Sequence, residues 1–356
     1  FQRKLGALKF LDPACGCGNF LVIAYRELRQ LEMEVLEARF GRELSEGHIR
    51  AECRLNVDQM YGIEIEEWPV RIAEVALWLM DHQMNSELLR RFGSAKATVP
   101  LTRSPTIRCA NALRLDWNEV LPAAECSYVM GNPPFVGKQF MTAEQKADIA
   151  DVFAGVKGAG VLDFVTAWYV RAAQYLRANS TIRVAFVSTN SITQGEQVAV
   201  LWSELFGKYR LKIHFGHRTF AWASEARGKA HVHVVIIGFG AANPGSKLLF
   251  DYDAKPLKAS DLAEGRTDNA EPVVTATTVA NISPYLVAGP DIWLPARSKP
   301  ISPVPEIVFG SMPNDGGHLI LTSEEKAELL DREPGAKKFL RPFVGSHEFI
   351  NGVRRW

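Results

Sequence analysis

Short apolar runs alternate along the first part of the chain with longer segments in which apolar residues recur every three or four positions. The short runs end in glycine, proline or polar residues, as buried strands do, while the longer segments are typical of helices that bury one face. The expected strands are 8–11, 59–66, 106–110, 128–131 and 182–188, and the expected helices are 19–40, 43–54, 69–85 and 162–176. Strands and helices in alternation predict an α/β fold with a doubly wound parallel sheet.

The alternation ends with two strands, 211–215 and 231–238, that follow each other without a long helix between them. This order predicts an antiparallel hairpin at the end of the sheet. We expect residues 218–222 to lie in the loop between these strands.

The composition shifts beyond about residue 245 to Pro, Ser, Asp and Thr, which is typical of irregular structure. We therefore expect a first domain over 1–245, a linker over 246–283, and the start of a second, smaller domain over 284–356.

The apolar residues of the helix expected over 69–85 also predict which of its faces is buried. Their spacing of three to four positions places them on one stripe, which we expect to face the sheet. This stripe comprises Ile72, Val75, Ala76, Leu79 and Met80.

Composition narrows the class of protein. The chain has 356 residues, a formal net charge of +1 and 47% hydrophobic residues, which describes a globular protein without a uniformly basic surface. Its five cysteines show no paired spacing beyond Cys15-x-Cys17, and no apolar run reaches the roughly 18 residues that a membrane span needs. We therefore expect a cytoplasmic protein without a membrane role. The chain starts at Phe1 rather than methionine and stops at Trp356 in mid-pattern, so we expect it to be a fragment.

The strand expected over 128–131 runs directly into the turn Asn132-Pro133-Pro134-Phe135. In an open α/β sheet, ligands bind beyond the carboxyl ends of the strands, which is where this turn lies. The two prolines stiffen the turn, so the side-chain oxygen of Asn132 and the carbonyl of Pro133 are held as two neutral acceptors. With the ring of Phe135 beside them, they suit an exocyclic amino group on a stacked heterocycle. The plainer interpretation is a tight turn that leaves a strand.

A glycine turn joins the first strand to the long helix over 19–40. Gly16 and Gly18 let the backbone approach a ligand closely, and the helix that follows presents free N–H groups. A dinucleotide site is disfavoured, because the third glycine is missing and no acidic strand end lies about 20 residues on. A Cys-x-Cys metal site is disfavoured as well, because no second pair matches it.

The strand expected over 59–66 carries a carboxylate, Glu64, near its end. A carboxylate at this place can accept hydrogen bonds from both ribose hydroxyls of a nucleoside. An exposed acid at a strand end is the alternative.

The segment 10–20, Phe-Leu-Asp-Pro-Ala-Cys-Gly-Cys-Gly-Asn-Phe, and the Asn-Pro-Pro-Phe turn together resemble motifs I and IV of the class I, S-adenosylmethionine-dependent amino-methyltransferases, specifically the N6-adenine DNA methyltransferases. With further segments at 217–220, 281–286, 341–346 and 350–356, the resemblance extends over essentially the whole chain to the MmeI-like single-chain restriction-modification enzymes. In that family a nuclease precedes the methyltransferase and a target-recognition domain follows it. The resemblance thus implies a methyltransferase over 1–245, the start of a recognition domain over 284–356, and a nuclease region upstream in the parent chain.

The resemblance also implies which residues hold S-adenosylmethionine: Asp12, Ala14, Gly16, Gly18, Glu64, Ile65, Asn111 and Trp168. Asn111 departs from the pattern, because the family commonly has an aspartate there that accepts a hydrogen bond from the cofactor's adenine amino group. An amide oxygen can accept that bond without supplying a charge, and Asp116 is the competing candidate. A plain core tryptophan is the alternative for Trp168.

The activity implied is site-specific methylation of DNA at adenine N6, with the turn Asn132, Pro133, Pro134 and Phe135 at its centre and double-stranded DNA as the partner. The adenine would be flipped out of the duplex and stacked on Phe135, with Phe220 opposite and Trp222 as second choice. Enzymes that methylate a glutamine side chain or an RNA base share the Asn-Pro-Pro motif and are the first alternative. A non-catalytic DNA-binding subunit that has kept the fold is the second.

Histidines at 214, 217, 231 and 233 raise the possibility of a zinc site on neighbouring strands. Alternation along one strand face explains two of them without a metal. Methyl transfer requires no metal in the family that the chain resembles, so we predict none.

Overall fold

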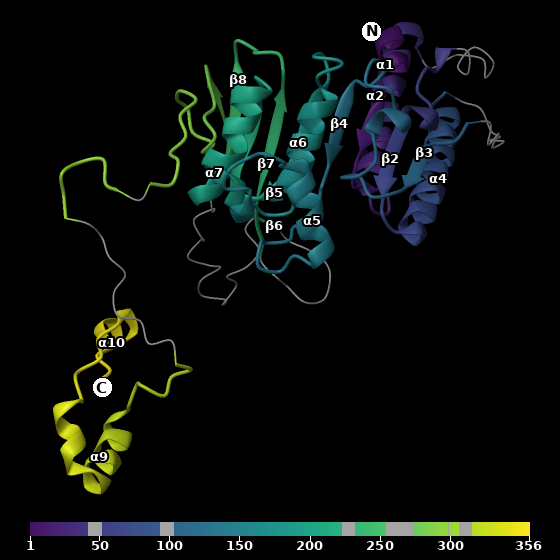
Figure 1. Ribbon diagram of the computed structural model, residues 1–356. Coiled ribbons are helices and arrows are strands. Elements are labelled where there is room, and N and C mark those ends of the chain that lie inside the picture. The colour runs from purple at the N-terminus through teal and green to yellow at the C-terminus, as the bar shows by residue number, and fades with distance from the viewer. Residues whose placement is uncertain (42–51, 93–102, 223–231, 254–272, 298, 306–314) are drawn as a thin grey trace. The chain divides into compact units, whose positions relative to one another are not determined.

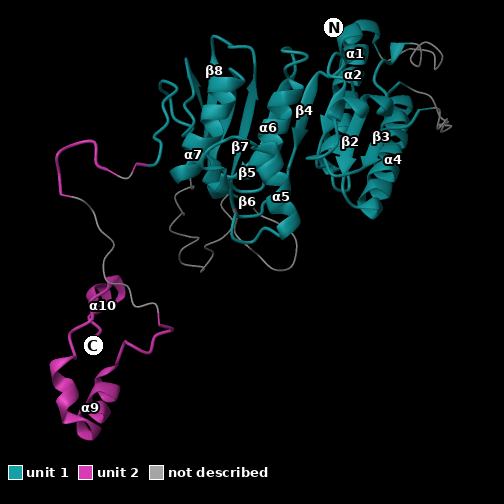
Figure 2. Cartoon of the chain, viewed as in Figure 1, with its two compact units in different colours: residues 1–296 teal, residues 297–356 magenta. Residues whose placement is uncertain are grey.

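The computed structural model describes residues 1–356 except 42–51, 93–102, 223–231, 254–272, 298 and 306–314 (Figure 1). The chain divides into two compact units, Phe1–Ala296 and Arg297–Trp356 (Figure 2). The first unit holds the sheet and its helices, and the second is small and helical.

The first unit is built on a nine-stranded sheet in the order β3-β2-β1-β4-β5-β7-β6-β8-β9. Strands β1 to β5 pair with one another in parallel, whereas β7 is antiparallel to both β5 and β6. The strands are β1 (Phe10–Asp12), β2 (Met60–Glu64), β3 (Thr106–Cys109), β4 (Tyr128–Gly131), β5 (Arg183–Thr189), β6 (Lys212–Trp222), β7 (Val232–Gly240), β8 (Lys247–Asp253) and β9 (Val273–Val279). The doubly wound sheet with its antiparallel final hairpin is therefore confirmed. The strand order reverses between β1 and β4, which is where an open α/β sheet has its ligand crevice.

The helices of this unit are α1 (Gln2–Ala7), α2 (Asn19–Phe40), α4 (Glu67–Arg91), α5 (Ala143–Val152), α6 (Thr166–Tyr175) and α7 (Gly195–Trp202). Helices α2 and α4 pack against each other, and α5 packs against α6 (Figure 1). The main core lies between α6 and the centre of the sheet, where Tyr169 meets Phe186 at 5.4 Å and stacks on Phe239 at 5.2 Å between ring centres. No helix in the described part of the chain is long and apolar enough to cross a bilayer.

Helix α4 buries a different face from the one that its apolar spacing predicts. Ile72, Val75 and Leu79 lie toward solvent, with Val75 and Leu79 exposed by 49% and 57%. Apolar residues occupy two opposite faces of this helix, so periodicity alone selected the wrong one. The residues that it buries are Val70, Ala73, Leu77, Met84, Leu88 and Leu89. Most of the helix expected over 43–54 lies outside the described residues.

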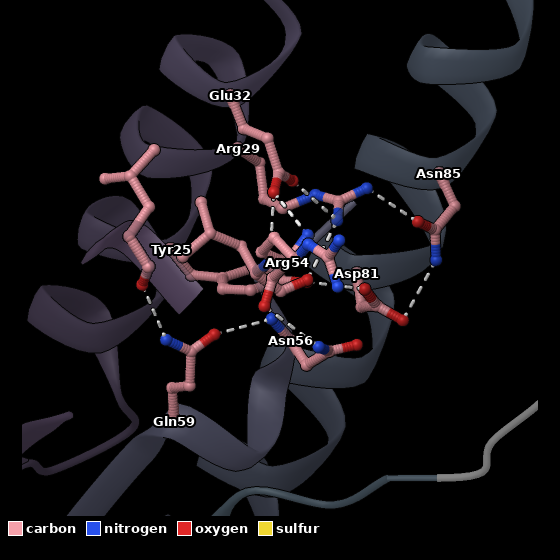
Figure 3. Close-up of polar contacts among 10 residues, drawn as sticks. Tyr25, Arg29, Glu32, Arg54, Asn56, Gln59, Asp81 and Asn85 are labelled. Atoms are coloured by element: carbon pink, nitrogen blue, oxygen red, sulfur yellow. Dashed lines mark hydrogen bonds and ion pairs between the residues drawn. The ribbon is translucent and has the colours of Figure 1, made fainter. Parts of the chain in front are cut away.

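A buried polar network joins α2 to α4 (Figure 3). Arg29 and Glu32 are only 2% and 1% exposed and form an ion pair at 3.3 Å. Arg29 also donates to Asn85 Oδ1 at 2.8 Å and to the Leu55 carbonyl at 3.0 Å. Glu32 accepts from the backbone N–H groups of residues 54 and 55, at 2.6 and 3.0 Å. The pair therefore fixes the chain just before β2 as well as the two helices.

Residues 246–283, which we expected to form a linker, instead contribute β8 and β9 to the sheet. Strand β8 runs parallel to β6, and β9 pairs antiparallel with β8. Leu249 of β8 is 2% exposed and belongs to the main core, which explains why this segment is ordered as a strand. The strand was not predicted because turn-forming residues flank it in the sequence and suggested a linker.

Residues 284–296, expected at the start of the second domain, belong to the first unit. Leu286 is 2% exposed in the main core, and the Asn281 side chain donates to the Gly289 carbonyl at 2.9 Å and to Asp291 at 2.7 Å. The second unit comprises α9 (Ser323–Arg332) and α10 (Ser346–Asn351), and a backbone pair at 2.7 and 2.9 Å ties Leu321 to Trp356.

Candidate active site

A cavity of about 480 Å³ opens at the carboxyl ends of β1, β2 and β4, within the range that small-molecule sites occupy. Residues from several loops and from α5 and α6 form its walls. The lining residues are Pro13, Ala14, Gly16, Ile63, Glu64, Ile65, Ala110, Asn111, Ala112, Asn132, Pro134, Thr142, Glu144, Gln145, Asp148, Phe164 and Trp168. The structure thus brings together most of the residues that the sequence singled out, from positions far apart in the chain.

Asp12 lies at the end of β1 beneath the glycine turn and is 1% exposed. Its Oδ1 accepts a hydrogen bond from the Ala14 N–H at 3.0 Å, which shapes the turn. Gly131, at the end of the neighbouring strand, is needed here because a Cβ would overlap Asp12 Oδ1. Gly16 takes φ +52° and Gly18 φ +83°, a region that favours glycine. Gly18 packs on Ala73 and does not line the cavity.

Glu64 connects the glycine turn to β2. One carboxylate oxygen accepts from the Gly16 N–H at 3.0 Å, and the other accepts from the N–H groups of Ile65 and Glu66 at 2.9 and 3.1 Å. These bonds fix the carboxylate in the cavity wall while leaving acceptor capacity for a ligand hydroxyl.

Burial raises the pKa of Asp12 to about 7, with the nearby negative charge of Glu64 adding to the effect and the Ala14 N–H opposing it. Asp12 does not line the cavity, but its buried carboxylate lies behind the wall that contains Glu64, and this arrangement favours a cationic ligand group.

Asp12 should therefore lower the stability of the unliganded protein as pH rises from about 4 to about 7. The folded state holds the proton to a higher pH than the unfolded chain, whose carboxyl has a pKa near 3.8, so ionisation opposes folding. We expect Asp12→Asn to be more stable than the parent by roughly 1–4 kcal/mol at pH 8, and the difference to shrink toward pH 5. Urea unfolding between pH 5 and 8 measures this. Asp116→Asn is the control. Hydrogen bonds from Asn118 lower the pKa of Asp116, so this substitution should not raise the stability at pH 8.

Asn132 directly follows β4, and its Oδ1 is buried without a hydrogen-bond partner among the described residues. A buried acceptor left without a donor costs roughly 1–3 kcal/mol, so native proteins rarely keep one without a role. In the same turn Pro133 is buried, Pro134 lines the cavity, and Phe135 is half-buried against the main core. An oxygen of this kind is suited to accept a hydrogen bond from a ligand.

Asp163 anchors the segment that leaves this turn. It accepts from the Lys138 N–H at 3.1 Å and from Ser191 Oγ, beyond the end of β5, at 2.6 Å. The next residue, Phe164, donates its N–H to the Val136 carbonyl at 2.9 Å. The turn is thus tied to the start of α6 and to β5, which restricts its movement.

Trp168 is both a core residue and part of the cavity wall. It is 5% exposed, donates from Nε1 to the Pro13 carbonyl at 3.0 Å, and meets Phe164 edge to face at 5.2 Å. A role in the core and a role beside a bound cofactor are therefore compatible for Trp168.

Sequence reasoning missed four cavity residues at and along α5: Thr142, which is the N-cap of the helix, and Glu144, Gln145 and Asp148. The pattern Thr142-x-x-Gln145 was an available signal, because it forms a capping box that starts this helix. Asn111 lies in the cavity wall as expected, whereas its competitor Asp116 is outside it and caps a 3-10 turn, Trp117–Glu119.

The expected loop over 218–222 is part of β6, which continues to Trp222. Phe220 pairs with Val234 across the hairpin, and its ring stacks on Tyr252 at 4.4 Å. Neither Phe220 nor Phe135 lines the cavity, so their expected places on either side of a flipped base stay a prediction. The side chain of Trp222 lies outside the described residues.

Within the described ranges, no group of His, Cys, Asp and Glu side chains is arranged to hold a metal ion. His217 instead bonds the Tyr252 hydroxyl at 2.6 Å, and His214 Nε2 bonds the Ala242 carbonyl at 2.7 Å. His231 lies outside the described residues. Burial raises the pKa of Cys15 well above its usual value, so this thiol stays neutral and is a poor metal ligand.

Comparison with known families gives two matches that cover most of the chain. Residues 1–251 match the family model described as "MmeI, DNA-methyltransferase domain". Residues 288–356 match the model described as "MmeI, target recognition domain".

Individual relatives agree with these matches. The chain is 41% identical to DNA methyltransferase A of Bacillus subtilis, over 99% of this chain and 38% of that protein. It is similar to the solved structure of the type IIL restriction-modification enzyme MmeI in complex with DNA, with 49% identity and a TM-score of 0.88, over 100% of this chain and 45% of that one. A putative type II restriction enzyme and methyltransferase of Methanocaldococcus jannaschii is 28% identical over 37% of this chain. The chain therefore spans less than half the length of the first two relatives.

Proposed function

Since the chain belongs to the MmeI family of DNA methyltransferases, we propose that it methylates adenine at N6 in double-stranded DNA, with S-adenosylmethionine as methyl donor. The observation that carries this proposal is the buried side-chain oxygen of Asn132, which has no hydrogen-bond donor in the described part of the chain and so can accept from an amino group of a ligand. Its place at the strand-order reversal, in the wall of a cavity of about 480 Å³, supports the same assignment.

The cavity residues suit this cofactor. The carboxylate of Glu64 is placed to accept from ribose hydroxyls, and the buried carboxylate of Asp12 favours the ammonium of the methionine end. Gly16, with open space where a Cβ would stand, lets the backbone approach the ligand. When bound, S-adenosylmethionine supplies an electrophilic methyl group attached to a sulfonium.

Asn132 and Pro133 would activate the adenine amino group. The lone pair of N6 is delocalised into the ring, which makes this nitrogen a poor nucleophile. Acceptance of its two hydrogens by Asn132 Oδ1 and by the Pro133 carbonyl would draw the nitrogen toward tetrahedral geometry and free the lone pair for the methyl group. No strong base is needed beforehand, because the proton leaves a nitrogen that has already become positively charged.

A base in a duplex cannot reach such a turn, so the adenine would be flipped out at a cost of a few kcal/mol. Stacking on Phe135 would return roughly 1–3 kcal/mol. Phe220 would contribute only if its ring left Tyr252, so Phe135 is the stronger candidate.

Residues 288–356 would supply contacts to the DNA sequence, because they match a target recognition domain. Their candidates for phosphate or base contacts are Lys337, Lys338, Arg341, Arg354 and Arg355. This match favours DNA over a glutamine side chain or RNA as the substrate. A nuclease region elsewhere in a longer parent chain is part of this proposal, because the MmeI relative, of which this chain covers 45%, is a restriction-modification enzyme.

The test is to incubate the protein with methyl-labelled S-adenosylmethionine and unmethylated genomic DNA, which offers every short sequence, and then to digest the DNA to nucleosides. We expect the label in N6-methyldeoxyadenosine. Label in N4-methyldeoxycytidine, or in added protein or RNA rather than DNA, would refute the proposal.

A further inference from the structure

We infer that Asp148 is a positioning residue that makes the neutral Asn111 the reader of the cofactor's adenine ring. This inference rests on the proposed cofactor. Both residues line the cavity, although they come from different elements: Asn111 follows β3, and Asp148 lies on α5.

The hydrogen bonds of Asn111 fix the direction of its amide. Its Nδ2 donates to Asp148 Oδ2 at 3.0 Å, and its Oδ1 accepts from the Leu113 N–H at 2.9 Å. A carboxylate can only accept and a backbone N–H can only donate, so turning the amide over would break both bonds. The amide oxygen therefore keeps one defined direction and retains a second lone pair for a ligand.

Asp148 is itself held firmly. It is 6% exposed, and its other oxygen accepts from Arg114 Nε at 2.6 Å, while Arg114 also reaches Glu144 at 2.8 Å. These hydrogen bonds engage both oxygens of the Asp148 carboxylate and so fix its orientation. The carboxylate absent from position 111 is thus supplied from α5, by a residue that also lines the cavity.

This arrangement should distinguish adenine from hypoxanthine. The exocyclic amino group of adenine can donate to Asn111 Oδ1, whereas hypoxanthine presents a carbonyl at that place and would bring two acceptors together. A site built around one hydrogen bond rejects a ligand that cannot make it.

The test exchanges the two side chains. Calorimetry measures the affinity of the parent, Asn111→Asp, Asp148→Asn and the double variant for S-adenosylhomocysteine and for S-inosylhomocysteine. We expect the parent to prefer the adenosyl ligand by at least about tenfold. Asp148→Asn should lose most of that preference, because an amide at 148 no longer fixes the direction of Asn111. Asn111→Asp should bind both ligands more weakly, because two carboxylates then face each other at about 3 Å.

The double variant decides the question, because it restores one carboxylate and one amide with their roles exchanged. We expect it to regain the adenosyl preference and to bind at least about tenfold better than the product of the two single effects. Asp151→Asn is the control: it removes an exposed carboxylate of α5 that does not line the cavity, and it should leave the preference unchanged.

The inference would be overturned by an unchanged preference in Asp148→Asn, or by single effects that simply multiply in the double variant. If a single variant does not fold, a double variant that folds without the preference would also overturn it, since the pair would then be a structural tie only. A parent that binds both ligands equally contradicts this inference alone. A parent that binds neither contradicts the proposed function as well.

Discussion

Asn132→Ala should lower the rate of methyl transfer by at least about a hundredfold while leaving cofactor and DNA affinity nearly unchanged. The substitution removes one of the two acceptors that we propose to polarise the target amino group, and deleting one such preorganised group typically costs about 10²–10³ in rate. The proposed cofactor contacts at Asp12 and Glu64 are on other strands and remain in place. Single-turnover methylation with saturating cofactor and DNA isolates this step from binding and product release.

Asn132→Asp refines that experiment, because a carboxylate keeps the acceptor and should retain partial activity. Gln139→Ala is a matched control, since it removes an exposed amide from the segment that follows the turn. Near-normal single-turnover rates in Asn132→Ala would mean that the turn is structural and that the chemistry lies elsewhere.

Glu32→Ala should destabilise the protein by about 3–5 kcal/mol, the usual result of removing one partner of a buried ion pair. The change leaves the charge of Arg29 buried and takes the acceptor from the N–H groups of residues 54 and 55. Urea unfolding at pH 7 measures the effect as a lower midpoint with an unchanged slope.

Glu74→Ala provides the comparison for that variant. It breaks the pair of Glu74 with Arg71, whose side chain is 60% exposed, and should leave the midpoint almost where it was. If Glu32→Ala and Glu74→Ala lowered the free energy of unfolding equally, burial of the Arg29–Glu32 pair would contribute nothing to stability.

The edge of the sheet that holds the cavity was predictable because parallel strands place their carboxyl ends at one edge. Asp12, Glu64, Asn111 and Asn132 each stand at or just after a strand end, so the four were expected together, and the structure places three of them in one cavity wall with Asp12 buried beneath. This conclusion needs only the strand order, which the alternation of elements indicates well.

Side-chain partners from other elements were not predictable in the same way. Asp148 lies on a helix 37 positions from Asn111, and nothing in the local pattern says that the two meet. Phe220 was misplaced because β6 continues several residues beyond its expected end, through irregular pairing between His217 and Phe220. Such irregularities depend on the neighbouring strand.

Segments with turn-rich composition were misjudged for a related reason. Strand β9 is exposed along almost its whole length, so it lacks the alternation that marks a half-buried strand. Its pairing with β8 supplies the order that its own side chains do not indicate. The prediction of the buried face of α4 was wrong for a different reason. This helix has apolar residues on two faces, and only tertiary packing selects the face that is buried.

The side-chain oxygen of Asn132, which has no hydrogen-bond donor among the described residues, also bears on how this protein could be engineered. An empty protein that buries such a group is less stable than the same fold with an apolar side chain of similar size there. A selection for thermal stability alone would therefore favour replacing the residue that we propose to be catalytic. Attempts to raise the thermal stability of this protein should keep Asn132 and change other positions, for example the exposed apolar residues of α4.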